Sequence, residues 1–242
     1  MTKRSLKDAV LITGSAKRIG KTIALTLAGL GYDIAFTYNS SKKEAGQTLD
    51  ELRDKGIQAE AYACDLSSEK ETRNLIPAVL KDFPHLRILI NNASIFEPSE
   101  LRDGDRRRLE KNFRMHLFAP YTLSVAFAKT CKDGQIVNII DRAVNQNTSQ
   151  YAHYLLSKKS LWDLTQMLCL EFAPRVRVNA VSPGAILPPG REDDDYLRKI
   201  IAAVPAKRKG NPQDVASAVT FLIKNKYVNG QMIYVDGGEH LL

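Results

Sequence analysis

A short apolar strand that leads through a glycine loop into a helix constrains the fold of this chain most strongly. The segment DAVLITG, residues 8–14, predicts a buried strand. RIGKTIALTLAGLG, residues 18–31, has apolar residues at helical spacing and ends at a glycine. TGSAKRIG, residues 13–20, joins the two. A loop in this place lets an anionic group rest on the N-terminus of the following helix.

Strands and helices alternate to the end of the chain. Further strands are expected at residues 32–39, 58–65, 86–94, 134–140, 176–184 and 230–238. Helices are expected at 43–56, 68–83, 211–223, a long region before residue 134 and the segment around Tyr154. Parallel strands need such crossovers, and nearly all-apolar strands are typical of sheets covered on both faces. We therefore predict the α/β class: one doubly wound Rossmann domain, residues 1–242, with a parallel sheet flanked by helices.

The composition favours a cytoplasmic protein with a large core. The 242 residues are 44% hydrophobic and 26% charged, and no apolar run approaches the roughly 20 residues of a membrane span. The basic N-terminus precedes the apolar run AVLI, which is too short for a signal peptide. We expect no membrane partner.

Cysteines and histidines give no sign of a disulfide framework or a metal site. Three widely spaced cysteines indicate free thiols in a reducing compartment: Cys64, Cys131 and Cys169. Four histidines are scattered without a His-x-x-x-His pair: His85, His116, His153 and His240. We therefore expect no metal.

The formal net charge is +8, which raises nucleic acid as a partner. The best candidate patch is RDGDRRRLEKNFR, residues 102–114, but acids are interleaved in it and no aromatic stacking pattern accompanies it. A solvated, salt-bridged helix face explains the patch better, and no nucleic-acid partner is predicted. A basic protein also attracts anionic small molecules, including a phosphorylated cofactor.

The glycine loop and the second strand predict NADP(H). Gly14 permits the tight turn, Gly20 lets the helix pack close to the sheet, and Arg18 stands where dinucleotide loops usually carry a small residue. An acid after the second strand would repel a 2′-phosphate. The sequence there is FTYNSSKK, with no acid before Glu44. The candidate phosphate contacts are Asn39, Ser40 and Lys17.

Asp65 ends the third strand in ACDLS and has two candidate roles. It could accept a hydrogen bond from the adenine amino group of the cofactor. It could instead cap the helix that follows, and both roles can hold together.

The segment NIIDRAVNQNTSQYAHYLLSKKS, residues 138–160, carries the candidate catalytic groups. Tyr154 and Lys158 stand one helical turn apart, and Asp141 lies thirteen positions before the tyrosine. An ammonium about 4–5 Å from a phenol favours phenolate by a few kcal/mol. Tyr154 is therefore expected to titrate nearer neutral pH, as an acid–base group should. Tyr151 shares the helix face but lies two turns from Lys158, and we expect it to line the site.

These motifs together resemble the short-chain dehydrogenase/reductase family along essentially the whole chain. The matching pieces are TGSAKRIG, CDLS, NNAS (91–94), Tyr154-x-x-x-Lys158, SPGAI (182–186), GNPQDVASAVTFL (210–222) and VDGG (235–238). The resemblance implies that Tyr154 donates a proton, Lys158 holds the nicotinamide ribose and the Pro-Gly segment lines the nicotinamide. It implies these cofactor contacts: Gly14, Lys17, Arg18, Ile19, Gly20, Tyr38, Asn39, Ser40, Asp65, Leu66, Asn92, Ala93, Ser94, Lys158, Pro183, Gly184 and Ile186.

Three residues depart from the usual family pattern. Asp141 replaces the catalytic serine, Arg18 replaces the small loop residue, and His116 in MHLFAPY replaces an asparagine of the proton relay. The first two, with NNASIFEP (91–98), are similar to the pteridine reductase branch. His116 departs from the better-known members of that branch, so its role stays open.

Asp141 suits a pteridine better than a ketone. A carboxylate repels the alkoxide that forms from a ketone, whereas it accepts from the amino and ring N–H groups of a pterin and disfavours phenolate. The resemblance implies hydride transfer from NADPH to a C=N bond, with a proton from the Asp141–Tyr154 pair. The implied substrate contacts are Arg18, Ser94, Phe96, Asp141 and Tyr154, with Phe96 stacking on a flat pterin or folate.

Other readings stay open at this point. A carbonyl reductase of the same fold, such as a 3-oxoacyl carrier-protein reductase, is the nearest alternative, and a non-catalytic NADP-sensing protein is another. The segment 187–201 is expected to form a flap over the substrate. The resemblance implies a homotetramer that assembles through the helix at 211–222 and the last strand. The sequence does not identify the pterin or folate.

Overall fold

The computed structural model describes residues 8–187, 198 and 201–242. Its strands are β1 (Ala9–Ile12), β2 (Asp33–Tyr38), β3 (Ala59–Ala63), β4 (Leu86–Asn91), β5 (Gly134–Ile139), β6 (Val176–Pro183) and β7 (Met232–Val235). They pair in parallel in one seven-stranded sheet of order β3-β2-β1-β4-β5-β6-β7. Most of the predicted flap, residues 188–197 and 199–200, lies outside the described part.

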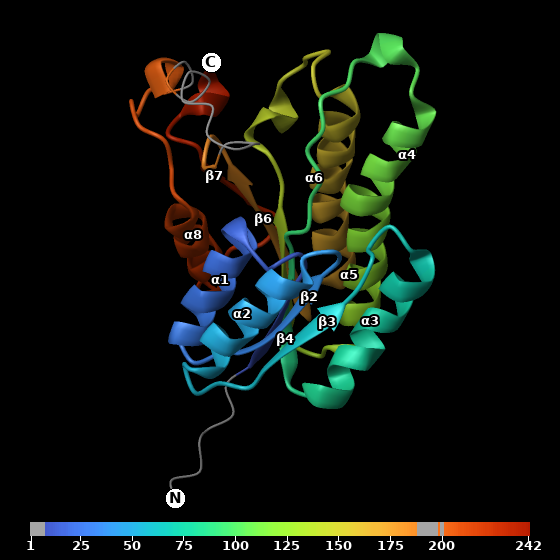
Figure 1. Ribbon diagram of the computed structural model, residues 1–242, viewed down its shortest axis with the longest axis vertical. Helices are drawn as coiled ribbons and strands as arrows, with labels where there is room; N and C mark the ends of the chain where they lie inside the picture. The colour runs from blue at the N-terminus through green and yellow to red at the C-terminus, as the bar shows by residue number, and fades with distance from the viewer. Residues whose placement is uncertain (1–7, 188–197, 199–200) are drawn as a thin grey trace, which may run out of the picture.

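Helices cover both faces of the sheet. They are α1 (Arg18–Gly29), α2 (Lys42–Arg53), α3 (Glu69–Asp82), α4 (Arg106–Phe113), α5 (Ala119–Thr130), α6 (Ala152–Phe172) and α8 (Pro212–Lys224). In Figure 1, α1, α2 and α8 lie on one side of the sheet, and α3 to α6 lie on the other. The predicted doubly wound α/β fold is confirmed. No helix of the described residues is long and apolar enough to cross a membrane.

The strands are apolar on both faces because each face meets a helix layer. In β1, Val10 and Ile12 join the core on the α1 and α8 side. Leu11 joins the core on the opposite side, which also contains Phe127 of α5. Successive side chains of a strand point to opposite faces, so a strand buried on both sides cannot alternate between apolar and polar residues.

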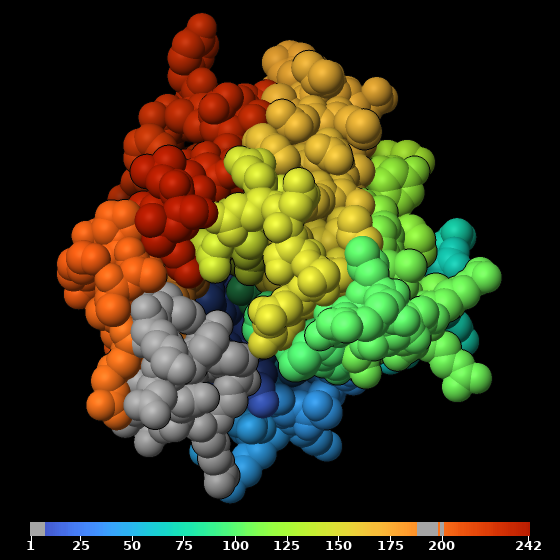
Figure 2. Space-filling model, turned by 90° about the horizontal axis from the view of Figure 1, so that it is seen from above, coloured from blue at the N-terminus to red at the C-terminus, as the bar shows by residue number. Residues whose placement is uncertain are grey.

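The order of the strands places the site. β1 lies between β2 and β4, so the chain winds in opposite directions on its two sides. Ligands of such sheets bind at this switch point, outside the carboxyl ends of the strands. Figure 2 looks onto this end of the molecule, where blue residues of the N-terminal segment lie in a depression beside the yellow segment that follows β5.

The long helical region expected before residue 134 is divided in the structure. A short turn, η1 (Leu101–Asp103), ends at Gly104, which has a φ of 59°. Asp105 then begins α4 by accepting a hydrogen bond from the Arg108 backbone N–H. A π-helical turn, η2 (Arg114–Phe118), separates α4 from α5. This break is important for the site because π-helical turns often mark functional positions.

The basic patch at residues 102–114 is a salt-bridged surface. Its four ion pairs are Arg102–Glu100, Arg106–Glu110, Arg108–Asp105 and Lys111–Glu97. Two acids within the patch and two just before it, Glu97 and Glu100, therefore neutralise part of the charge locally, which agrees with the predicted salt-bridged surface.

Packing within the chain explains the amphipathic pattern of α8. Its apolar face, which includes Val215, Val219 and Leu222, is buried in the core on the α1 side. Phe221 lies on the exposed face. The homotetramer stays a prediction.

Two glycine substitutions test the packing at the switch point. Gly14 has a φ of +66°, and a Cβ there would lie 2.8 Å from the Ala93 Cα atom. We expect Gly14→Ala to lower the free energy of unfolding by about 2 kcal/mol, because it adds backbone strain and a clash. A Cβ on Gly46 in α2 would meet no atom within 4 Å outside its own helix backbone, so Gly46→Ala should stabilise by about 0.5–1 kcal/mol. Urea unfolding measures the free energy of unfolding of both variants. Equal changes in the two variants would contradict the close packing of Gly14 against Ala93.

Candidate active site

Hydrogen bonds between β1 and β4 hold the glycine loop. The Thr13 Oγ1 atom accepts from the backbone N–H groups of Asn92 and Ala93, at 2.9 and 3.0 Å. Asn92 Nδ2 donates in return to the carbonyl oxygens of Thr13 and Gly14. A Cβ on Gly20 would lie 2.5 Å from Asn92 Nδ2, so this position requires glycine. The structure thus brings Gly14, Gly20, Asn92 and Ala93 together.

The N-terminus of α1 fits an anionic group. Its N-cap residue, Lys17, makes no side-chain cap hydrogen bond, and the first turn holds no acid. Backbone N–H groups at a helix N-terminus bind phosphate oxygens, as a dinucleotide requires. Arg18 begins the helix with a φ of 57°, which costs a non-glycine residue about 1–2 kcal/mol. Ile19 packs against the core beside it.

The predicted 2′-phosphate contacts lie at the end of β2. Asn39 and Ser40 are exposed directly after Tyr38, which packs against the core. Lys17 lies 4.0 Å from the Glu44 carboxylate, and both side chains are largely exposed. Such a pair contributes little, so Lys17 can turn to a phosphate at small cost.

Asp65 does not cap the helix that follows it. Its Oδ1 atom accepts from the backbone N–H and the hydroxyl of Ser67, at 2.9 and 2.8 Å. Ser68 is the N-cap of α3 and accepts from the Glu71 N–H. The predicted capping role of Asp65 is therefore wrong. The helix begins three residues later, because the strand ends early and a turn precedes the helix. Leu66 is buried beside Asp65.

Asp141 and Tyr154 form the centre of the site. Asp141 follows β5 and caps a short turn, η3 (Arg142–Asn145), by accepting from the Ala143 N–H at 2.8 Å. This bond uses Oδ1. The other oxygen, Oδ2, accepts from the Tyr154 hydroxyl at 2.8 Å. The carboxylate is therefore fixed by backbone on one side and offered to the phenol on the other.

The pKa of Tyr154 is raised well above its usual value. Burial contributes most, the charge and hydrogen bond of Asp141 add to it, and a hydrogen bond with Ser94 opposes it. The expectation that Lys158 brings Tyr154 near neutral pH is wrong for this arrangement. A phenol that faces a carboxylate in a buried place remains protonated, which makes it a proton donor.

Lys158 is buried beneath the phenol. Its Nζ atom donates to the Ile139 carbonyl oxygen at 2.8 Å and lies 5.8 Å from the Tyr154 ring centroid. Burial lowers the pKa of Lys158 to about 8, although Asp141 acts in the opposite direction. The side chain is 2% exposed.

Aromatic rings line the outer side of the phenol. Phe96 stacks on Tyr151 with ring centroids 4.3 Å apart and meets the Tyr154 ring edge-on at 4.9 Å. Tyr151 precedes α6 with a φ of 55°. The lining role expected for Tyr151 agrees with this position. Phe96 is 42% exposed, so part of its surface is open to a flat molecule.

Residues near the C-terminus pack against the loop that follows β6. Pro183 ends the strand, and a Cβ on Gly184 would lie 2.6 Å from Glu239 Oε2. Glu239 accepts from the Ala185 N–H at 3.0 Å and pairs with Arg142 at 2.8 Å. Ile186 is buried next to this loop.

Sequence reasoning missed Thr13 and Glu239. Thr13 was visible as the polar end of a buried strand, but its double acceptor role depends on the pairing of β1 with β4. Glu239 carried no signal, because its contacts join segments that are far apart in the chain. Among the described residues, no group of three His, Cys, Asp or Glu side chains could hold a metal ion.

The comparisons with known proteins agree with this geometry. A family model described as enoyl-(acyl carrier protein) reductase matches residues 14–240. The structure of FolM alternative dihydrofolate reductase 1 from Brucella suis, in complex with NADP, is similar with a TM-score of 0.93 and 34% identity. It covers 99% of this chain and 97% of that chain.

Curated relatives include reductases of other substrates. The 3-oxoacyl-[acyl-carrier-protein] reductase FabG of Staphylococcus epidermidis is 29% identical over 98% of this chain and 100% of its own length. NADPH-dependent aldehyde reductase 1 of Arabidopsis thaliana is 30% identical over 94% of this chain and 84% of its own length.

The fold, the glycine loop and the tyrosine–lysine pair define an NADP-dependent oxidoreductase. This chain belongs to the short-chain dehydrogenase/reductase family.

The lowered pKa of Lys158 gives a test by unfolding. The shift from 10.5 to about 8 corresponds to about 3 kcal/mol of stability lost while the buried amine is charged. We expect Lys158→Met to stabilise the protein by about 2–3 kcal/mol at pH 7. The gain should shrink as pH rises from 8 and fall below about 1 kcal/mol at pH 10, because the unfolded lysine then loses its proton too.

The neighbouring lysine provides the control. Lys159 donates to Asn147 at the surface, and Lys159→Met should change stability by no more than about 0.5 kcal/mol at either pH. If Lys158→Met destabilised the protein at pH 7, the buried ammonium would not lower the free energy of unfolding, and this interpretation would be wrong.

Proposed function

We propose that this protein is an NADPH-dependent pteridine reductase that converts a dihydropterin or dihydrofolate to its tetrahydro form. The observation that carries the proposal is the 2.8 Å hydrogen bond from Tyr154 to Asp141. Asp141 stands at the position where the family usually has a serine. The similarity to the FolM alternative dihydrofolate reductase of Brucella suis supports the same reading.

The reaction adds a hydride and a proton across a C=N bond. Bound NADPH supplies the hydride to the carbon. Tyr154 gives its proton to the nitrogen, so the bond becomes CH–NH and the phenol regains a proton from solvent. Asp141 keeps the phenol protonated before transfer and can accept hydrogen bonds from the amino and ring N–H groups of the substrate. In our proposal Tyr154, Asp141 and Lys158 are the catalytic residues.

The lining residues suit a flat ring with polar edges. Phe96 offers an open ring surface beside Tyr154, and aromatic stacking contributes about 0.5–1.5 kcal/mol beyond burial. Ser94 is exposed on the same loop. Arg18 at the start of α1 could contact both the pyrophosphate and an oxo group of the substrate.

The cofactor would rest on the N-terminus of α1 and the Asn92–Ala93 turn. Its adenosine 2′-phosphate would meet Asn39, Ser40 and Lys17, with Asp65 near the adenine. Lys158 would hold the nicotinamide ribose. The loop from Pro183 to Ile186 would line the nicotinamide.

The alternative is reduction of a 3-oxoacyl thioester, which the FabG relatives favour. Asp141 argues against it, because the carboxylate repels the oxyanion that forms during ketone reduction. A purely NADP-sensing protein would not need the buried Tyr154–Lys158 pair.

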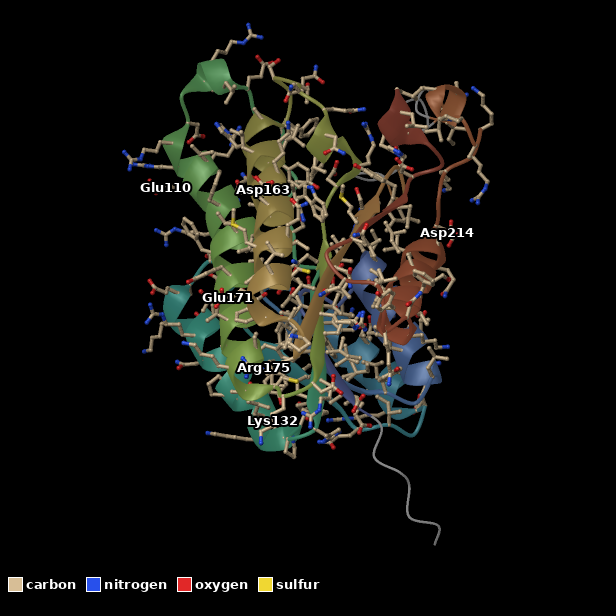
Figure 3. The ribbon with its side chains drawn as sticks, turned by 180° about the vertical axis from the view of Figure 1, so that it is seen from behind. Glu110, Lys132, Asp163, Glu171, Arg175 and Asp214 are labelled. Carbon is tan, nitrogen blue, oxygen red and sulfur yellow. The ribbon has the colours of Figure 1, made fainter. Side chains whose placement is uncertain are left out.

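Steady-state oxidation of NADPH separates these reactions. The substrates are dihydromonapterin, dihydrobiopterin, dihydrofolate, folate and an acetoacetyl thioester. We expect turnover of a dihydropterin or dihydrofolate, and a loss of about 100-fold in kcat in Asp141→Ser. Asp163 lies on the same helix as Tyr154 (Figure 3) and is exposed, so Asp163→Ser is the control and should keep full activity. Turnover of the thioester alone would contradict the proposal.

A further inference from the structure

His116 is a buried histidine that the proposed reaction does not use. It lies in the π-helical turn η2 and is 1% exposed. Its ring meets the Tyr154 ring edge-on, with centroids 5.4 Å apart. The charged or titratable groups that face it are Tyr154 and Lys158, both on α6.

The hydrogen bonds of His116 define which ring nitrogen carries the proton. The Ile95 backbone N–H, which can only donate, lies 3.2 Å from Nε2. Nε2 is therefore an acceptor. Nδ1 lies 2.8 Å from Ser157 Oγ, and that hydroxyl donates its own proton to the Tyr154 carbonyl oxygen at 2.6 Å. The proton is thus on Nδ1, and the ring is neutral.

The electrostatic surroundings agree with a neutral ring. Burial lowers the pKa of His116 well below its usual value, and the charge of Lys158 lowers it further. A neutral imidazole has no proton to give near neutral pH, so His116 does not act as an acid there.

Ser94 lies between His116 and the phenol. Because Nε2 is an acceptor, the Ser94 hydroxyl donates to it at 2.9 Å, and a longer contact of 3.3 Å leads to the Ile95 carbonyl oxygen. The same side chain neighbours the Tyr154 hydroxyl, where a hydrogen bond from Ser94 would act to lower the pKa of the phenol. Asp141 and burial act in the opposite direction. At rest the Ser94 proton is directed to His116 and the Tyr154 proton to Asp141.

We propose that His116 is a positioning residue that holds Ser94 as a second hydrogen-bond donor for the Tyr154 oxygen. When the phenol passes its proton to the substrate, the Ser94 hydroxyl turns from His116 Nε2 to the phenolate oxygen. Nε2 keeps the Ile95 N–H as its donor, so no buried group loses its last partner. No proton leaves Ser94 or His116. A bond to a charged oxygen is stronger than one to a neutral nitrogen, which favours the exchange.

This exchange rests on the proposed reaction. It supplies a hydrogen-bond donor for the negative charge that Tyr154 carries after it has given its proton to the substrate. Asp141 disfavours the negative charge that Tyr154 develops, and Lys158 directs its ammonium to Ile139. Ser94 is a neutral donor beside the phenol, and its bond to His116 holds it in place until the phenol loses its proton.

Four variants and a double variant test the proposal. Ser94→Ala removes the donor and should lower kcat about 10-fold, which corresponds to about 1.4 kcal/mol, with little change in NADPH affinity. His116→Phe keeps a ring but has no acceptor and should give a similar loss. His116→Gln places an amide oxygen near the Nε2 position and should restore much of kcat. Ser160→Ala, on α6, removes a hydroxyl that donates to the Leu156 carbonyl oxygen of its own helix, and should leave kcat unchanged.

The double variant Ser94→Ala/His116→Phe decides between positioning and simple packing. If His116 acts through Ser94, the double variant should lose no more than either single variant. Losses that multiply, a fully active Ser94→Ala, or a His116→Gln as slow as His116→Phe would each overturn the proposal. Ser94→Ala is informative alone if a His116 variant fails to fold.

The same proteins are compared with whichever substrate the wild type reduces. A wild type that reduces only the thioester refutes the pteridine function, while the kcat pattern of the variants still tests the His116–Ser94 pair. The two failures are therefore distinguishable.

Discussion

The hydrogen bond between Tyr154 and Asp141 joins the two elements that make the site. Asp141 stands at the carboxyl end of β5, where the Ala143 N–H fixes one of its oxygens. Tyr154 is presented by α6, which packs against β6 and the turn η2. Displacement of either element would leave a buried phenol or a carboxylate without its partner, which is costly. Burial and this bond together raise the pKa of Tyr154 and keep the phenol protonated.

Two opposing electrostatic effects meet at the phenol. Burial and Asp141 raise the pKa of Tyr154, whereas burial lowers the pKa of Lys158 to about 8. The phenol is thus held in its neutral form, whereas Lys158 still carries its proton at pH 7 but loses it more easily than a free lysine, so the pair does not resemble a phenolate–ammonium pair at rest. Such an arrangement suits a reaction that consumes a proton at nitrogen. It suits poorly a reaction in which an oxyanion forms beside the same carboxylate.

The fold and the glycine loop could be read from the sequence because they depend on local patterns, whereas the other site residues were predicted from the family resemblance. Apolar strands, helical spacing and the glycines of residues 13–20 are each set by neighbouring residues, and parallel topology brings the carboxyl ends of the strands together. The turn after β3, the π-helical turn at His116 and the stacking of Phe96 on Tyr151 could not be read in this way. They depend on contacts between segments that are distant in the chain, and periodicity carries no information about them.

The direction of the Tyr154 pKa shift shows the same limit. The spacing of Tyr154 and Lys158 correctly places an ammonium near the phenol, but spacing says nothing of burial or of where Nζ points. In the structure Nζ donates to the Ile139 carbonyl oxygen, and desolvation dominates. Electrostatic roles therefore need the three-dimensional surroundings even where the residues themselves are evident.

The most direct measurement is the ionisation of Tyr154 followed by NMR with tyrosine labelled with ¹³C at the ring carbon bearing the hydroxyl. Tyr154→Phe identifies the resonance among those of the nine tyrosines. We expect the Tyr154 signal to remain that of a protonated phenol above pH 10, and to titrate at lower pH in Asp141→Ala. A wild-type Tyr154 that ionises near neutral pH, or a titration that Asp141→Ala leaves unchanged, would contradict the role assigned to the carboxylate.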